Sequence, residues 1–273
     1  MQAIYFGESG DDSAELKGSS RLGWKGKVAL NNTWSALART EWQVVAENSG
    51  YKTSDIDPRH IYVGFDGSQY GQFLFGQTDT AFYDVVAVTD IFNEWGSAAN
   101  GYGGRQEGQA IYRGAWNGLM FNASYQTNDD SRDIDNGFAL STGYTFDFGL
   151  GLAAGMERKE LADNTEKKDW ALSANYAING FYFACMYNES DIDGAEGNGF
   201  ELAATYNVDA WTFLAGYNFA EVKEAGVKED AVDETLLGVG YNFTPKLLAY
   251  AEYKIQGIKD ADYEFTVALQ YNF

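Results

Sequence analysis

The stretch YEFTVALQYNF, residues 263–273, alternates between two kinds of side chain along its whole length. Its apolar phase holds Tyr263, Phe265, Val267, Leu269, Tyr271 and Phe273, and its other phase holds Glu264, Thr266, Ala268, Gln270 and Asn272. Because successive side chains of a β-strand point to opposite faces, this stretch predicts a strand with one apolar face and one polar face. The preceding segment LLAYAEYKI (247–255) repeats the pattern, with Glu252 and Lys254 on the polar phase.

Runs of this kind follow one another from end to end of the chain, with no change in composition that would indicate a linker. We therefore interpret residues 1–273 as a single domain. Sixteen strands are predicted, at about 1–8, 19–30, 34–47, 59–67, 71–78, 105–116, 118–127, 136–146, 149–159, 168–178, 180–190, 198–208, 211–222, 234–243, 246–257 and 262–273.

The connections between these strands alternate between short and long. The short ones include NNT (31–33) and the NG pairs at 117–118 and 179–180, while the long ones are acidic, as in LADNTEKK (161–168), SDIDGAEG (190–197) and VKEAGVKEDAVD (222–233). This rhythm is typical of an up-and-down barrel with turns at one rim and loops at the other. Closure also removes the sheet edges that lipid does not tolerate. The predicted fold is all-β: a 16-stranded antiparallel transmembrane β-barrel.

The composition supports strands and limits the partners. Tyr, Phe and Trp number 19, 18 and 7, Gly 31 and Pro only 2, which favours strands and tight turns over helices. With 19 basic and 40 acidic residues the net charge is −21, which argues against nucleic-acid binding and favours cations. The chain contains no run of 18 apolar residues, and barrel strands do not need one. Because it begins at MQAIYFGESG without a secretory signal, we expect a mature product whose targeting segment was removed or replaced.

One long stretch departs from the alternation: QTDTAFYDVVAVTDIFNEWGSAANGYGGR, from Gln77 to Arg105. It contains spaced carboxylates and ends in a glycine-rich exit. Loops of this length inside a compact repeating pattern are usually functional. We interpret it as a loop folded into the barrel lumen, where Asp90 and Glu94 face basic wall residues at the narrowest point. Their spacing of four would place both on one face of a helical turn, if the loop forms one there.

Five segments, in order and at compatible spacing, resemble the general diffusion porins of Gram-negative outer membranes, most closely the enterobacterial and Vibrio types. They are SSRLGWKGKVAL (19–30), PRHIYVGFDGSQYGQFLFGQ (58–77), VTDIFNEWG (88–96), GGRQEGQAIYRGAW (103–116) and the terminal QYNF (270–273). The resemblance implies a trimeric, 16-stranded barrel in the bacterial outer membrane, in contact with lipid and lipopolysaccharide. It also implies that Arg21, Arg59 and Arg105 form the basic side of a pore constriction and Asp90 and Glu94 the acidic side.

Further details follow from the same comparison with the porin pattern. Lys25, Arg39, Glu41 and Arg113 are expected to be additional lumen residues, because ionisable groups belong on the water-facing side of such strands. The sequence departs from the pattern at Gln77, at Asn93 and at Ala98, where an arginine, a proline and a further acid are common. These departures weaken the acidic side and put the rigidity of the loop in question.

The functional hypothesis is passive diffusion of small hydrophilic solutes and ions, because opposed charges across a narrow aqueous passage create a transverse field that orders water and penalises apolar solutes. The net charge of −21 and the acidic loops predict a preference for cations. A sugar-specific channel is an alternative, which would need a continuous aromatic path; Trp95 and Tyr102 are its obvious loop candidates. A structural adhesin with acidic binding loops is a more distant alternative.

An enzyme is not expected. His60 is the single histidine, and it is expected to face away from the side of its neighbour Arg59. The sequence contains no GxSxG, zinc-ligand or phosphate-loop motif, so no catalytic residue, cofactor or specific metal site is predicted. Weak Ca²⁺ or Mg²⁺ binding by the acidic loops NDDSRDID (128–135) and SDIDGAEG is the remaining metal hypothesis. Cys185 is alone, so it forms no intrachain disulfide.

Overall fold

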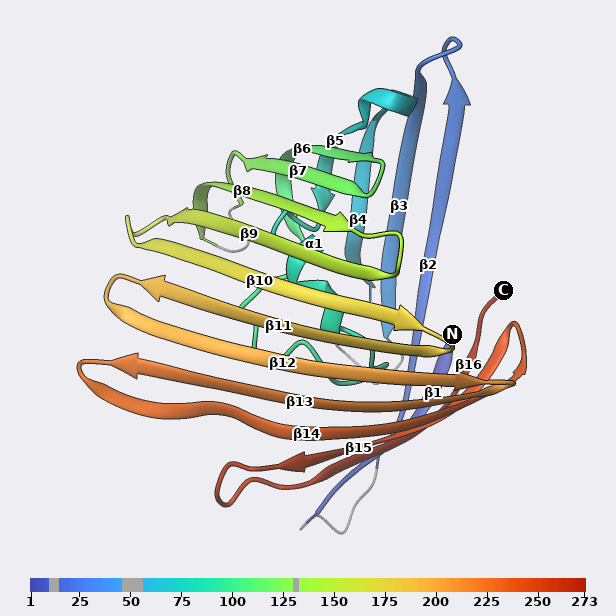
Figure 1. The fold of residues 1–273 in the computed structure, drawn as a ribbon, viewed down its shortest axis with the longest axis vertical. Coiled ribbons are helices and arrows are strands. Elements are labelled where there is room, and N and C mark those ends of the chain that lie inside the picture. The colour runs from blue at the N-terminus through green and yellow to red at the C-terminus, as the bar shows by residue number, and fades with distance from the viewer. Residues whose placement is uncertain (10–14, 46–55, 130–132) are drawn as a thin grey trace.

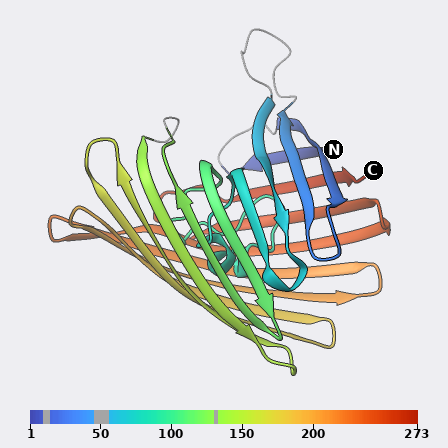
Figure 2. The same ribbon diagram turned by 90° about the horizontal axis from the view of Figure 1, so that it is seen from above.

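The computed structural model describes residues 1–9, 15–45, 56–129 and 133–273. They form a closed barrel of 16 strands in which each strand pairs with its neighbours in sequence and β1 pairs antiparallel with β16 (Figure 1). The two chain ends therefore lie side by side (Figure 2), and the Met1 amino group donates a hydrogen bond to the Tyr271 carbonyl oxygen at 3.0 Å. The predicted fold class is confirmed.

A strand is present at each of the predicted ranges, but the strand predicted at 234–243 begins earlier, at Val227, and the one predicted at 19–30 begins at Glu15. The bounds of the strands are β1 Gln2–Glu8, β2 Glu15–Ala29, β3 Ser35–Val45, β4 Ile56–Asp66, β5 Gln72–Thr78, β6 Gln106–Trp116, β7 Leu119–Gln126, β8 Ile134–Thr145, β9 Leu150–Leu161, β10 Glu166–Ile178, β11 Phe181–Ile192, β12 Ala195–Val208, β13 Trp211–Glu224, β14 Val227–Thr244, β15 Leu247–Gln256 and β16 Glu264–Tyr271. The short helices are η1 Ser68–Tyr70, α1 Tyr83–Val86 and η2 Ala87–Thr89. No helix in the described ranges has the length and apolar character needed to cross a membrane.

The two faces of β16 differ as the alternation predicts. Val267 and Leu269 are 51% and 49% exposed on the outer surface, whereas Thr266 and Ala268 are buried. Ala268 packs with Ile4 of β1 and Tyr250 of β15 on the inner side. The outer face is therefore suited to lipid, and the inner face is covered by other parts of the protein.

Tight turns join most strands at both rims, which corrects one prediction. The acidic segments 161–168, 190–197 and 222–233 are not long loops, because β9 to β14 continue into them. The turns at Asp193–Gly194 and Ala225–Gly226 have positive φ at both central residues, the geometry that closes a two-residue hairpin. Ion pairs between neighbouring strands, such as Lys228 Nζ to Glu221 Oε1 at 2.6 Å, then keep these polar strand ends paired.

The largest buried cluster lies between the wall and the stretch from Asp79 to Arg105, which we call the inner loop. Its residues Phe82, Val85 and Val86 are at most 1% exposed and pack against a patch of the wall that includes Ala139, Ala171 and Met186. Figure 1 shows α1 inside the ring of strands. Full burial of such side chains stabilises by about 1.5–3 kcal/mol each, so the inner loop is packed in place as a core would be.

The outward orientation of the apolar phase leads to a stability prediction. Leu202, in the middle of β12, is 48% exposed on the outer face. Leu202→Arg should destabilise the barrel by about 2–4 kcal/mol in lipid, while Val208→Arg, at the end of the same strand, should cost about 0–1 kcal/mol. Urea unfolding in lipid vesicles measures both. Equal effects of the two substitutions would contradict the assignment of a lipid-facing side.

Candidate functional site

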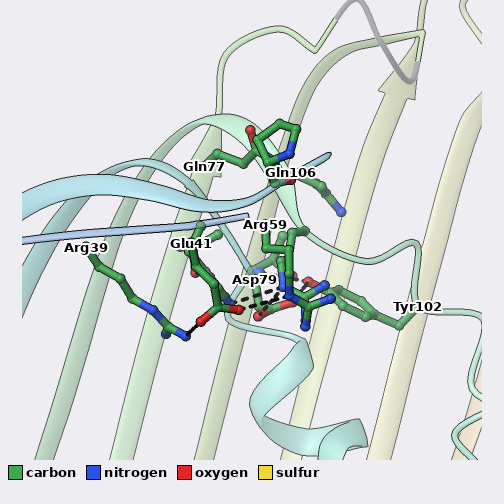
Figure 3. Close-up of polar contacts among 12 residues, drawn as sticks. Arg39, Glu41, Arg59, Gln77, Asp79, Tyr102 and Gln106 are labelled. Atoms are coloured by element: carbon green, nitrogen blue, oxygen red, sulfur yellow. Dashed lines mark hydrogen bonds and ion pairs between the residues drawn. The ribbon is translucent and has the colours of Figure 1, made fainter. Parts of the chain in front are cut away.

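The basic side of the lumen is built on β2, β3 and β4. On β3, Glu41 accepts hydrogen bonds from Arg39 Nη2 at 2.6 Å and from Arg59 Nε of β4 at 2.9 Å. Figure 3 shows the two arginines on either side of this carboxylate. Arg21 of β2 donates through Nε to Gln43 Oε1 at 3.1 Å. The Glu41 carboxylate thus accepts from two guanidinium groups, and Arg21 donates to a neutral amide. This side of the lumen therefore retains a net positive charge.

An irregularity in the β3–β4 pairing shapes this wall. Glu41 pairs with His60 and Trp42 with Pro58, which leaves Arg59 as an extra residue on β4. Proline lacks an N–H and is tolerated at such bulges. The bulge places both Arg59 and His60 on the lumen side, so the prediction that they face opposite ways is wrong. The His60 ring is buried, with Nδ1 2.9 Å from Thr78 Oγ1 and Nε2 3.2 Å from Arg105 Nε.

The other predicted lumen residues also face inward. Lys25 pairs directly with Arg39 across β2 and β3 and so shares its face. Arg113 of β6 donates from Nη1 to both carboxylate oxygens of Asp84 at 2.5 Å. Burial raises the pKa of Asp84, and the positive charge of Arg113 opposes that rise. Arg113 therefore anchors α1 to the wall.

A polar cavity of about 640 Å³ lies between the inner loop and the basic wall. Arg21, Arg59 and Arg105 line it, and Asp90 lines it from the inner loop. Burial raises the pKa of Asp90, while a hydrogen bond from Tyr83 and the charges of Arg105 and Arg21 oppose the rise. The structure thus brings all three predicted arginines and one of the two predicted acids to a single opening.

Glu94 is placed differently. Helix η2 ends at Thr89, and Asp90 has a non-helical backbone, so no helical turn aligns the two acids. Glu94 instead accepts hydrogen bonds from the Tyr250 hydroxyl of β15 and from Gln2 Nε2 of β1. Its carboxylate therefore ties the inner loop to the wall, while Asp90 faces the cavity.

Buried carboxylates of the wall hold the inner loop, a role that the sequence analysis missed. Glu252 of β15 accepts from the Asn93 backbone N–H at 2.8 Å and from Asn93 Nδ2 at 2.9 Å. Glu201 of β12 accepts from the Ala99 N–H at 2.9 Å and from the Thr89 hydroxyl. Hydrogen bonds to charged groups are worth about 1.5–3 kcal/mol each. A proline at position 93 could make neither bond to Glu252, so this departure from the porin pattern fixes the loop.

Three wall glycines allow the inner loop to come this close. A Cβ added at Gly199 of β12 would lie 1.9 Å from the Ala99 carbonyl oxygen. One at Gly155 of β9 would lie 2.8 Å from Val85, and one at Gly216 of β13 would lie 2.7 Å from Phe92. Any side chain at these positions would push the loop away. These glycines within strands are a sequence signal for close approach.

The sequence profile of the Gram-negative porin family matches residues 3–260. The chain belongs to this family. This porin is therefore a channel protein of the bacterial outer membrane and not an enzyme.

Individual relatives agree with this assignment. The porin is 28% identical to outer membrane porin N of Escherichia coli strain K12, over 89% of this chain and 79% of that protein. It is 28% identical to outer membrane protein U of Vibrio parahaemolyticus over 92% and 78%. Among solved structures, OmpF of Salmonella typhi in complex with daunomycin has a TM-score of 0.90 at 19% identity, covering 100% of this chain and 96% of that one.

The glycine contacts generate a prediction about loop docking. Gly199→Ala should displace the inner loop and lower the melting temperature of the barrel, because the added methyl group collides with the Ala99 carbonyl. Gly26→Ala on β2 is the matched control, since an added Cβ there has open space around it. Thermal unfolding in detergent measures both. If Gly199→Ala has the same melting temperature as Gly26→Ala, the inner loop does not dock against β12.

Proposed function

We propose that this porin passes small hydrophilic solutes and ions by passive diffusion, through a lumen that is narrowest at the cavity. The observation that supports this most directly is the facing of Arg21, Arg59 and Arg105 against Asp90 across one polar opening. Such opposed charges orient water and dipolar solutes and disfavour apolar solutes. Arginine suits this wall because it stays protonated even beside other arginines.

We further propose that the pore prefers cations at low salt. The net charge of −21 attracts cations over a long range, whereas the arginine wall acts locally and opposes the preference. Salt screens exposed charges beyond a Debye length, which falls from about 30 Å at 0.01 M to about 3 Å at 1 M. The preference should therefore decline as salt is raised.

A sugar-specific channel is the second candidate, but the aromatic residues of the inner loop do not favour it. The Trp95 ring lies 6.4 Å from that of Phe6 and 5.5 Å from Lys254 Nζ, so wall groups occupy its surroundings. Tyr102 packs on Tyr83 at 5.2 Å and donates to Asp79 Oδ1 at 3.3 Å. These two rings are used in packing and do not form a continuous path.

A homotrimer in contact with outer-membrane lipid and lipopolysaccharide is proposed as the working assembly. Large apolar side chains cover the outer face of the early strands, including Trp24, Val28 and Val63, each about 60% exposed. An OmpT structure of Vibrio cholerae, described as a trimer form, has a TM-score of 0.82 at 20% identity and covers 96% of that chain and 100% of this one.

Weak Ca²⁺ or Mg²⁺ binding by the acidic loops stays a prediction. Residues 130–132 of NDDSRDID lie outside the described residues. In the parts of the chain that the structure describes, no three His, Cys, Asp or Glu side chains gather to hold a metal ion.

The separation of Asp90 from Glu94 generates a selectivity prediction. Asp90→Asn should reduce the cation preference, because it removes the carboxylate that faces the arginines. Arg21→Gln should increase the preference. Glu94→Gln is the matched control: it neutralises a nearby carboxylate that faces Tyr250, and should change selectivity much less.

Reversal potentials in a planar bilayer with a KCl gradient measure all three variants. An anion preference of the unchanged porin at low salt would contradict the proposed selectivity. An equal effect of Asp90→Asn and Glu94→Gln would contradict the geometry of the opening. The absence of conductance would contradict the channel function itself.

A further inference from the structure

His60 is an unusual partner for an arginine at the opening. Its imidazole is 6% exposed and lies between the Thr78 hydroxyl and the Arg105 guanidinium. An arginine side chain donates hydrogen bonds and has no acceptor. Because Arg105 Nε–H donates to His60 Nε2, that ring nitrogen is unprotonated. The ring is therefore neutral, with its proton on Nδ1 and directed at Thr78 Oγ1.

In the part of the chain that the structure describes, the Arg105 side chain is held by His60 and, at longer range, by Asp79. Arg105 precedes β6 in the glycine-rich exit of the inner loop, where the backbone has no regular secondary structure. Its charged contact is Asp79, whose Oδ2 lies 3.7 Å from Arg105 Nε, a long distance for an ion pair. Asp79 also accepts a hydrogen bond from Tyr102. The shorter contact to His60 is therefore the one that sets the direction of the guanidinium.

The group that holds Arg59 differs in charge from the group that holds Arg105. Arg59 is held by the carboxylate of Glu41, which offsets part of its charge. His60 holds Arg105 without adding a negative charge. Asp79 offsets part of the Arg105 charge, but from the longer distance of 3.7 Å. The guanidinium of Arg105 thus keeps positive charge in the cavity that it shares with Arg21 and Arg59.

We propose that His60 is a positioning residue for ion selectivity: its Nδ1–H tautomer, fixed by Thr78, holds the Arg105 guanidinium in the wall of the opening and away from a close pair with Asp79. This inference rests on the proposed channel function. Without the His60 acceptor, the Arg105 guanidinium forms a close ion pair with Asp79. The Asp79 carboxylate then offsets the charge of Arg105, and the opening becomes less positive. The cation preference then rises.

Two substitutions at one position separate this role from simple packing. His60→Asn keeps a polar group near Thr78 but is too short to reach Arg105, so the reversal potential should shift toward the cation side. His60→Gln places an amide oxygen near the position of Nε2 and should restore selectivity close to that of the unchanged porin. The shift in His60→Asn should not exceed that of Arg105→Gln.

A double substitution tests whether His60 acts through Arg105. In an Arg105→Gln background, His60→Asn should cause no further shift. Thr78→Val tests the tautomer and remains available if a His60 variant does not fold: losing the Thr78 acceptor should shift selectivity in the same direction. This substitution leaves the Thr78 backbone carbonyl, which accepts a hydrogen bond from Gln109 Nε2, unchanged.

Each variant is measured in planar bilayers after its barrel is shown to be folded by its resistance to unfolding in detergent. The proposal is overturned if folded His60→Asn keeps the original reversal potential, if His60→Gln shifts as far as His60→Asn, or if the shift persists in the Arg105→Gln background. Unchanged selectivity of Thr78→Val overturns the assigned tautomer and with it the positioning role. Failure of the unchanged porin to conduct would instead contradict the proposed function, so the two failures are distinct.

Discussion

Buried carboxylates of the barrel wall are the constraint on which the site depends. Glu157, Glu201 and Glu252 are at most 3% exposed, and a buried carboxyl group is costly unless hydrogen-bond partners satisfy it. Each accepts from the inner loop: Glu157 from the Thr80 hydroxyl at 2.6 Å, and the other two from backbone N–H groups. Loop and wall thus satisfy each other's polar groups, so displacement of the loop within the protein would leave both sides with broken hydrogen bonds.

This mutual anchoring explains how an irregular segment can shape a pore. Apolar packing of α1 against β8 to β11 fixes one end of the inner loop, and Glu252 fixes the part that follows Asp90. Asp90, which lies between these two anchors, faces the arginines of β2 and β4 across the cavity. The two charge sets therefore oppose each other because packing and hydrogen bonds outside the opening hold them there. The charge pairs of the opening itself are partly exposed and add little, since such pairs are worth about 0–1 kcal/mol.

Most of the fold could be predicted from the sequence, because the alternation of β-strands is a local property. The apolar phase of 263–273 gave the correct outer face, and the NG pairs gave correct turns. The polar composition of the segments near Asp193 and Ala225 predicts loops, whereas the structure pairs most of their residues as strands. In those segments the turn residues indicate the structure better than the polar composition does, since Gly194 and Gly226 have the backbone conformation that a two-residue hairpin needs.

The site could be predicted only in part, because its details depend on contacts between distant residues. The porin-like segments predict the three arginines and both acids as site residues, and the structure places the arginines and Asp90 at the cavity. Glu94 lies in the same porin-like segment as Asp90, but its partner Tyr250 is 156 residues away. His60 was assigned to the wrong face because a bulge opposite Trp42 cancels strict alternation. Neither a tertiary partner nor a bulge could be identified from the local pattern.

The most direct test of the central claim asks whether Asp90 faces the water-filled passage. In a Cys185→Ser background, Asp90→Cys is exposed to a bulky, water-soluble thiol reagent during single-channel recording, with Leu269→Cys on the outer face as the control. The structure predicts that modification at position 90 lowers the current through each open channel, while the control current stays constant. An unchanged current after complete modification at position 90 would show that the inner loop lies outside the conducting path.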